Sequence, residues 1–227
     1  MPDAVWVLNP MYEREHGPAG LSQHEPRQGR LADGSTQPAT FTGADAATGV
    51  APADGPVRTG HLGEGRRRLR WAELAQRVGD PVVPDGLLPS SRCFPSARKD
   101  TGWPPGIFLP TEGSLDRDTW NRLISVLTEH STAGPDTPCL AYYNPLMLVP
   151  TDFENLHVRA GRLGSAEALY DNPEAGCSPS NLWTEDHSWV LCTDYDLWAT
   201  KVAGPPALIE ALLNDAEIEA VRLSWAS

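Results

Sequence analysis

The sequence predicts an α+β fold, a small mixed sheet with packed helices, and two observations carry that expectation. Trp71, Leu74, Ala75 and Val78 have the i, i+3, i+4, i+7 spacing of an amphipathic helix. Towards the C-terminus, short apolar runs separated by Gly, Pro and Asp predict strands around one further helix. The last part of the chain is therefore expected to be a ββαβ unit.

The first 65 residues are expected to form a disordered or linker-like segment. Between positions 13 and 65, 15 of 53 residues are Gly or Pro and only six are large aliphatic or aromatic residues. Such a segment cannot bury enough apolar surface to offset its ordering entropy. Ala4–Leu8 is an exception, a short apolar run that predicts an edge strand. We therefore expect a single α+β domain over residues 66–227.

Ordered structure is expected to begin near Arg66. Residues 66–70 contain four arginines, which we interpret as a basic flank that solvates the start of the first helix; a phosphate or nucleic-acid site is the alternative. The stretch 79–113 is rich in Pro and Gly and predicts a loop. Ser114 is the expected N-cap of a second helix, whose apolar stripe starts at Trp120.

His130 and Gly134-Pro135 are expected to end this second helix, after which the pattern changes to strands. Cys139–Tyr143 and Leu156–Arg159 are short strand candidates. A brief helix is expected from Ser165.

The clearest element is a hairpin near the C-terminus. Ser188–Thr193 and Trp198–Ala203 predict two strands that flank the turn residues Asp194–Asp196. Pro205-Pro206 ends the second strand and suits the first turn of a helix. Val221–Trp225 then alternates apolar and polar residues, as a half-buried strand does.

The negative charge of the chain lies in its second half. Residues 1–110 carry 12 basic and 12 acidic side chains, whereas residues 111–227 carry 6 basic and 18 acidic ones, which accounts for the net charge of -12. A nucleic-acid binder would need more basic residues than the neutral first half supplies. An acidic region favours a basic protein as partner and speeds its association.

Trp183, Trp189 and Trp198 cluster within 16 residues, in the same stretch as the acidic hairpin. Buried tryptophan usually belongs to a core, whereas exposed tryptophan is enriched as an interface anchor. We expect this Trp-rich, acidic hairpin to bind a basic protein. The candidate interface residues are Trp183, Glu185, Asp186, Trp189, Asp194, Tyr195, Asp196 and Trp198.

The sequence predicts no metal site, no bound cofactor and no group of catalytic residues. Asp194-Tyr195-Asp196 lacks the spaced acids and the glycine of a calcium loop, and Asp favours turns in any case. The four cysteines form no CxxC pair and have no short spacing to histidine, so the sequence contains no zinc or redox motif. Ala199-Thr200-Lys201 lacks the acid that a metal-dependent nuclease would carry there.

A small hydrolase remains as an alternative function. It would use Cys177 as nucleophile with His157 or His187 as its base, because a thiol needs an imidazole within hydrogen-bond reach.

A second enzyme alternative rests on residue order. Arg159, a serine (Ser178 or Ser180) and Glu217-Ile218-Glu219 loosely resemble the Arg, Ser and Glu-x-Glu order of ADP-ribosyltransferases. That resemblance implies a pocket in which Arg159, a serine and Glu219 converge.

The sequence also bears on location. The N-terminus has neither a basic stretch nor a long apolar run, so we expect no signal peptide. No apolar run approaches the ~20 residues of a membrane span. We therefore expect a cytoplasmic protein with reduced thiols and no membrane contact.

The segment from Cys177 to Leu223, which begins CSPSNLWTEDHSWVLCTDYDLWATKVAGPP, resembles hypothetical proteins of Streptomyces-type actinobacteria. RWAELAQRVGD, CFPS and DTPCLAYY resemble the same group, so the likeness covers about residues 68–225. The resemblance implies an uncharacterised actinobacterial family and supplies no catalytic residue.

Overall fold

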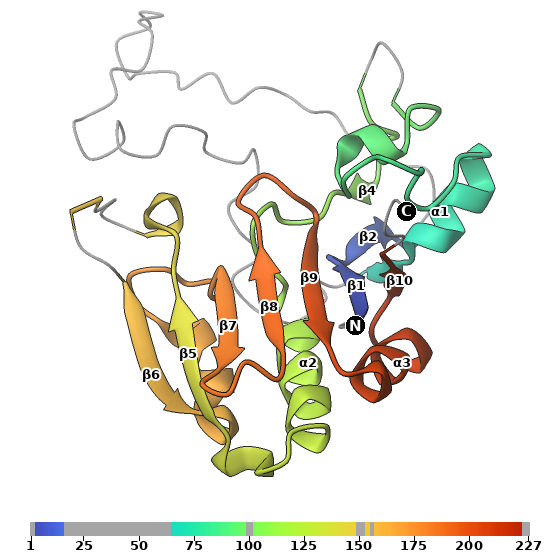
Figure 1. The fold of residues 1–227 in the computed structure, drawn as a ribbon. Helices are drawn as coiled ribbons and strands as arrows, with labels where there is room; N and C mark the ends of the chain where they lie inside the picture. Colours follow the sequence, from blue (N-terminus) through green and yellow to red (C-terminus); the bar gives the residue numbers. More distant parts are fainter. Residues whose placement is uncertain (1–2, 16–64, 99–101, 149–152, 155–156, 224–227) are drawn as a thin grey trace, which may run out of the picture.

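Seven antiparallel strands form the main sheet of the protein, in the order β10-β1-β9-β8-β7-β5-β6 (Figure 1). The structure is a computed structural model and describes residues 3–15, 65–98, 102–148, 153–154 and 157–223. The strands of the main sheet are β1 (Asp3–Leu8), β5 (Pro138–Tyr142), β6 (Val158–Arg162), β7 (Asn181–Thr184), β8 (Val190–Thr193), β9 (Ala199–Gly204) and β10 (Ala220–Arg222). A smaller sheet has the order β3-β2-β4, with β2 (Met11–Arg14), β3 (Arg66–Leu69) and β4 (Ile107–Phe108).

The helices of the described residues are three α-helices and four short 3-10 helices. They are α1 (Trp71–Val78), η1 (Ser91–Cys93), α2 (Arg117–Glu129), η2 (Gly134–Asp136), η3 (Pro145–Met147), η4 (Leu163–Asp171) and α3 (Pro206–Asn214). This composition confirms the predicted α+β class. Every strand pair in the described residues is antiparallel, where a mixed sheet was expected. Short connections such as those between β7, β8 and β9 permit only antiparallel neighbours.

The predicted ββαβ unit is present as β8, β9, α3 and β10, and β8 pairs with β9 as the hairpin predicts. However, β10 does not pair with this hairpin. β1 lies between β9 and β10, with Val5 opposite both Val202 and Arg222.

The prediction of β1 as an edge strand in a separate N-terminal segment is therefore wrong for this part of the chain. Val5 and Val7 are fully buried, and so are Ala4 and Leu8 on the other side of the strand. A strand that is apolar on both sides belongs inside a sheet. Residues 3–15 thus belong to the folded body, whereas the predicted linker over 16–64 lies outside the described residues.

Two helix boundaries and one strand differ from the prediction. The N-cap of α2 is Asp116, whose Oδ1 accepts the backbone N–H of Thr119 at 2.9 Å. Ser114, the expected cap, is instead buried and contacts the Ser178 hydroxyl at 3.1 Å. The brief helix expected from Ser165 is the 3-10 helix η4, and the strand expected over 156–159 is β6.

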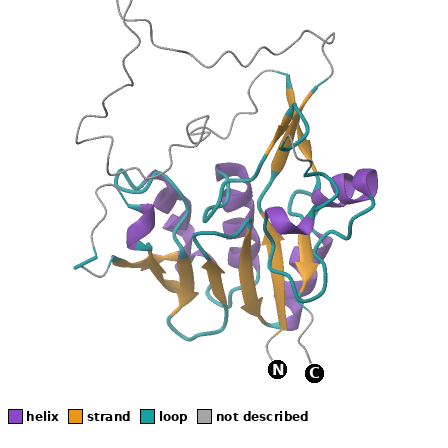
Figure 2. Ribbon diagram, turned by 90° about the horizontal axis from the view of Figure 1, so that it is seen from above, coloured by secondary structure: helices purple, strands orange, loops and turns teal. Residues whose placement is uncertain are grey.

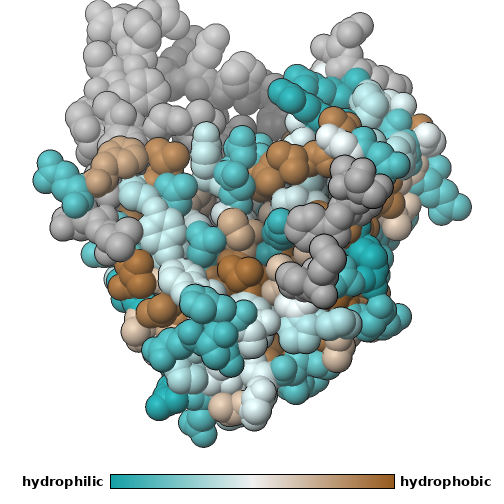
Figure 3. All heavy atoms as spheres, in the orientation of Figure 1, coloured by the Kyte–Doolittle hydropathy of each residue, from teal (hydrophilic) through white to brown (hydrophobic). Residues whose placement is uncertain are grey.

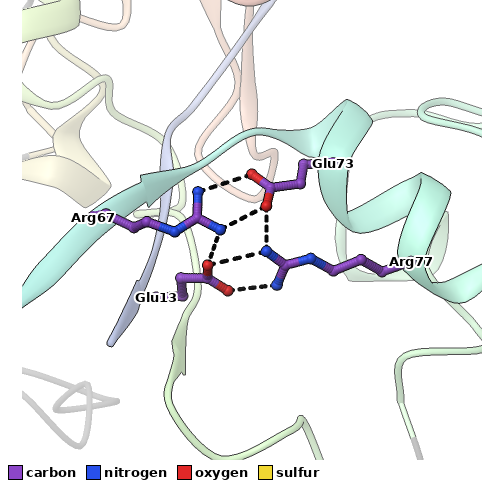
Figure 4. Close-up of polar contacts among 4 residues, drawn as sticks. All are labelled: Glu13, Arg67, Glu73 and Arg77. Atoms are coloured by element: carbon purple, nitrogen blue, oxygen red, sulfur yellow. Dashed lines mark hydrogen bonds and ion pairs between the residues drawn. The ribbon is translucent and has the colours of Figure 1, made fainter. Parts of the chain in front are cut away.

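The basic stretch before α1 is a strand rather than a solvated flank. β3 pairs with β2, which brings Arg67 opposite Glu13. Figure 4 shows these two residues in a ring of ion pairs with Glu73 and Arg77 of α1. The Arg67–Glu73 contact is 2.6 Å and the Arg77–Glu13 contact is 2.5 Å. Arg67 is therefore held by carboxylates of its own chain.

Two apolar clusters cover different parts of the main sheet. The first packs α2, α3 and η4 against one side, which includes Val5, Val202 and Leu191. The second packs α1 and the loop around Phe94 near the β1 end, where Trp6 and Val221 contact it. Trp6 alternates with Val5 and Val7 along β1, so this second cluster lies on the opposite side of the sheet.

The opposite side of the sheet is therefore covered at β1 and β10 but not at β5–β8. α2 and η4, which pack against the core side of these strands, lie behind them in Figure 1 and to one side of them in Figure 2. None of the described helices packs on their front side.

Candidate functional site

The strands β5–β8 have one face that the described helices leave uncovered, and the register defines its residues. One cross-strand row runs through Ala160, Leu140, Trp183 and Val190. A second row runs through Val158, Tyr142, Asn181 and Cys192. We call these eight residues the open face.

On β5, β7 and β8, the neighbours of these residues in sequence point into the core, because successive side chains alternate along a strand. Leu182 and Leu191 are at most 1% exposed, and Ala141 is 2% exposed. By contrast, Val190 is 41% exposed and Val158 is 38% exposed. The remaining apolar members are half-buried or exposed, and Figure 3 shows hydrophobic side chains over these strands.

Acidic turns stand at the two ends of β8. Glu185 and Asp186 lie in the turn between β7 and β8, and Asp194 and Asp196 lie in the turn between β8 and β9. All four are exposed. Because adjacent turns of a meander lie at opposite ends of the shared strand, these carboxylates frame the open face from both sides.

The first of these turns is locally ordered. The Asp186 carboxylate accepts the backbone N–H of Ser188 at 3.0 Å. Hydrogen bonds from the Thr184 side chain and from Ser188 lower the pKa of Asp186 below its usual value. His187 has a φ of 56°, a left-handed conformation that a tight turn requires. The carboxylate is therefore held ionised at this end of the face.

Trp183 is the one tryptophan of the predicted trio that reaches the open face. Trp189 and Trp198 are each 2% exposed, so the expectation that they serve as interface anchors is wrong. Trp189 donates its Nε1–H to the Ser131 hydroxyl at 2.9 Å. Trp198 packs against Trp71 with ring centroids 6.1 Å apart. Trp189 directly precedes β8 and Trp198 directly precedes β9, and both are core residues because other elements of the chain cover them.

The structure thus keeps six of the eight predicted interface residues at the surface. Tyr195 is 49% exposed in the turn between β8 and β9. The sequence reasoning missed the rest of the open face. A signal for it was present, because strands such as Cys139–Tyr143 are apolar at successive positions. A strand with one solvated side alternates apolar with polar residues. A strand that is apolar at successive positions therefore indicates that both of its sides are covered, by the chain itself or by a partner.

The groups that a hydrolase would need are not activated. Cys177 is buried, and burial raises the pKa of its thiol to about 11. A thiol with that pKa stays protonated at neutral pH and is a poor nucleophile.

The groups that an ADP-ribosyltransferase would need do not converge. Arg159 lies on β6 at one edge of the main sheet, whereas Glu219 directly precedes β10 at the other edge. Six strand spacings of about 4.8 Å separate the two edges by roughly 29 Å. Glu219 instead accepts the backbone N–H groups of Trp71 and Ala72, each at 2.8 Å. A hollow of about 330 Å³ between α2 and η4 contains neither residue.

Three of the four arginines before α1 are engaged within the chain. Arg67 forms the ion pairs described above, Arg66 lies 3.7 Å over the Phe108 ring, and Arg70 donates to the Ala216 carbonyl. These contacts account for Arg66, Arg67 and Arg70 without a nucleic acid.

Within the described ranges, no group of three or more His, Cys, Asp or Glu side chains is placed to hold a metal ion. The same residues include no helix with the length and apolar character to cross a membrane. No family model, curated protein or solved structure matches this chain.

Proposed function

We propose that this protein binds a basic protein through its open face, with Trp183 as the central anchor. The observation that carries the proposal is that strands with apolar side chains on both sides are covered on only one side by the described residues. Aromatic residues that are partly exposed among aliphatic neighbours are the usual centres of binding energy in protein interfaces. Trp183 has Leu140 and Val190 as its cross-strand neighbours.

The size of the face implies that the acidic turns take part. Eight side chains on four strands cover roughly 19 Å by 14 Å, or about 270 Å². A standard interface takes about 800 Å² from each partner. A partner seated on the face must therefore also contact the turns at the ends of β8.

The charge of those turns selects the partner. Carboxylates at both ends of β8 attract a basic surface and repel an acidic one, which contributes to specificity and association rate. Exposed charges are screened with a Debye length of about 8 Å at physiological salt. Binding is therefore expected to weaken as the salt concentration rises.

Protein binding of this kind fits a regulatory or immunity-like role in the cytoplasm. All four cysteines are free, and Cys192 is exposed on the open face. An exposed thiol suits a reducing compartment, in which it is not oxidised.

Capture of a partner from a lysate of the source cells tests this proposal when wild type is compared with variants of the open face. We expect Trp183→Ala to reduce capture at least ~30-fold, because a hot-spot residue contributes about 2 kcal/mol or more. The double variant Asp194→Asn, Asp196→Asn should weaken capture at 50 mM salt and have little effect at 500 mM. Leu88→Ala is the matched apolar control, since Leu88 is 57% exposed outside the face.

Labelling of Cys192 with a maleimide locates the contact. A captured protein that sits on the face slows labelling of Cys192, and the same protein added to the Trp183→Ala variant leaves the labelling rate unchanged. Equal capture by wild type and Trp183→Ala would contradict the proposal, and so would an affinity that does not change with salt concentration.

A further inference from the structure

The edge strand β6 has backbone groups that no other described strand uses. It pairs with β5 alone, and all five of its residues are exposed. Tyr143 donates to the carbonyl of His157, and Leu163 donates to the carbonyl of Thr137. These two bonds show that the backbone groups of the odd-numbered residues of β6 bond to β5. Hydrogen-bonded and non-hydrogen-bonded pairs alternate along an antiparallel ladder.

Val158, Ala160 and Arg162 therefore direct their backbone N–H and carbonyl groups to the free edge. Natural sheets usually protect such an edge with charged side chains, lysine above all, or with proline or a bulge. β6 has no proline and no lysine, and its register with β5 is continuous over five residues. Its two charged side chains are engaged within the chain: Arg162 donates to the Asp136 carbonyl at 2.5 Å, and Arg159 donates to Oδ1 of Asn172 at 3.3 Å. The edge is thus open to a further strand.

We propose that β6 pairs with β6 of a second copy of this chain, antiparallel about a two-fold axis at Ala160. This register places Ala160 opposite its own equivalent and Val158 opposite Arg162 of the second copy. In this register the outward N–H and carbonyl groups of Val158, Ala160 and Arg162 bond to the second copy, except where a carbonyl accepts a hydrogen bond from the first turn of η4. Arg159 then lies opposite Gly161 of the second copy, so no arginine opposes another.

The pairing is weak and depends on concentration. Two five-residue strands meet over about 17 Å, which buries far less than the ~1,200 Å² of a stable interface. Each chain also carries a net charge of -12, so the copies repel one another. Salt screens this repulsion, and dimerisation is therefore expected to strengthen as salt rises.

This salt dependence is opposite to that of the proposed function. Val158 and Ala160 belong to both the edge and the open face, so the dimer joins two open faces into one continuous surface. If the proposed function holds, the dimer presents that surface to a partner with two sites, and avidity raises the affinity. The dimer itself does not depend on the proposed function.

Sedimentation velocity on the full chain, from 5 to 500 μM at 50 and 500 mM salt, tests the pairing. For wild type we expect a weight-average sedimentation coefficient that rises with concentration, and a Kd at least about threefold lower at 500 mM salt. Ala160→Pro removes an outward N–H that the β5–β6 ladder does not use. It should retain the circular dichroism of wild type and remain monomeric. Ala160→Ser keeps the N–H and should dimerise as wild type does.

Disulfide trapping tests the register in a Cys192→Ser background. Two Cα atoms of a directly opposed, hydrogen-bonded pair lie about 5.5 Å apart, within the reach of a disulfide. Ala160→Cys should therefore crosslink on mild oxidation. Val158→Cys is the matched control, because its two copies would lie about 14 Å apart. It should remain uncrosslinked.

A wild-type chain that stays monomeric to 500 μM at both salt concentrations would overturn the inference. Equal dimerisation by Ala160→Pro, or crosslinking through Val158→Cys as fast as through Ala160→Cys, would do so as well. If the wild type is monomeric but Ala160→Pro loses capture of the basic partner, the edge accepts a strand of that partner and the dimer is refuted. Loss of capture in Trp183→Ala concerns the proposed function alone.

Discussion

The carboxylate of Glu219 joins two distant parts of the chain, and its removal should have a measurable cost. Its two oxygens accept the backbone N–H groups of Trp71 and Ala72, the first two residues of α1, each at 2.8 Å. Arg70, the N-cap residue, provides no side-chain cap of its own. Glu219 therefore caps α1 from a segment almost 150 residues later in the sequence.

The expected cost of Glu219→Ala is about 2 kcal/mol. Loss of a helix cap costs about 1 kcal/mol. Trp71 is fully buried, and leaving its N–H without an acceptor adds roughly 1 kcal/mol more. For a domain of this size, 2 kcal/mol corresponds to a fall in Tm of about 4–8 °C.

Urea unfolding followed by tryptophan fluorescence measures this change. With an m value of about 2 kcal/mol/M, the midpoint should fall by about 1 M. Glu217→Ala is the matched control, because Glu217 is exposed two positions away and its side chain makes no hydrogen bond or ion pair within the described residues. It should change stability by less than about 0.5 kcal/mol. If the two variants unfold at the same midpoint, the capping argument is wrong.

Three further predictions follow from single residues. Hydrogen bonds from two arginines lower the pKa of Glu73 to about 2. The contribution of its carboxylate to stability is therefore complete above about pH 5 and is lost as the pH falls towards 2. The difference in the free energy of unfolding between wild type and Glu73→Gln should shrink over that range. Gly113→Ala should cost about 2–3 kcal/mol in urea unfolding, because its φ is +71° and an added Cβ would lie 2.9 Å from the Tyr195 backbone, whereas Gly134→Ala, with φ +52° and open space, should cost about 1 kcal/mol. Mass spectrometry after brief maleimide treatment of the native chain should find the label on Cys192, the one exposed cysteine, and equal labelling of all four would indicate local unfolding.

The elements with a strong local pattern were predictable. α1 and α2 repeat apolar residues with a helical period, and the hairpin of β8 and β9 has turn residues between two apolar runs. In these cases the residues that decide the element are close in sequence. The class of the fold and six surface residues of the candidate interface followed from such local signals.

The positions of the elements relative to one another were not predictable in the same way. β1 inserts between β9 and β10, and this depends on a pairing between Val5 and Val202 across almost 200 residues. Trp189 and Trp198 became core residues for the same reason, because the elements that cover them come from elsewhere in the chain.

The sequence by itself therefore determined which residues alternate along each strand and where the helices begin and end within a few positions. Only the tertiary structure decided which side of each strand is covered. Side-chain alternation follows from backbone geometry, which is local. Coverage depends on which distant helix packs on which side of the sheet. That packing buries Trp189 and leaves Trp183 half-buried on a face that the described helices do not cover.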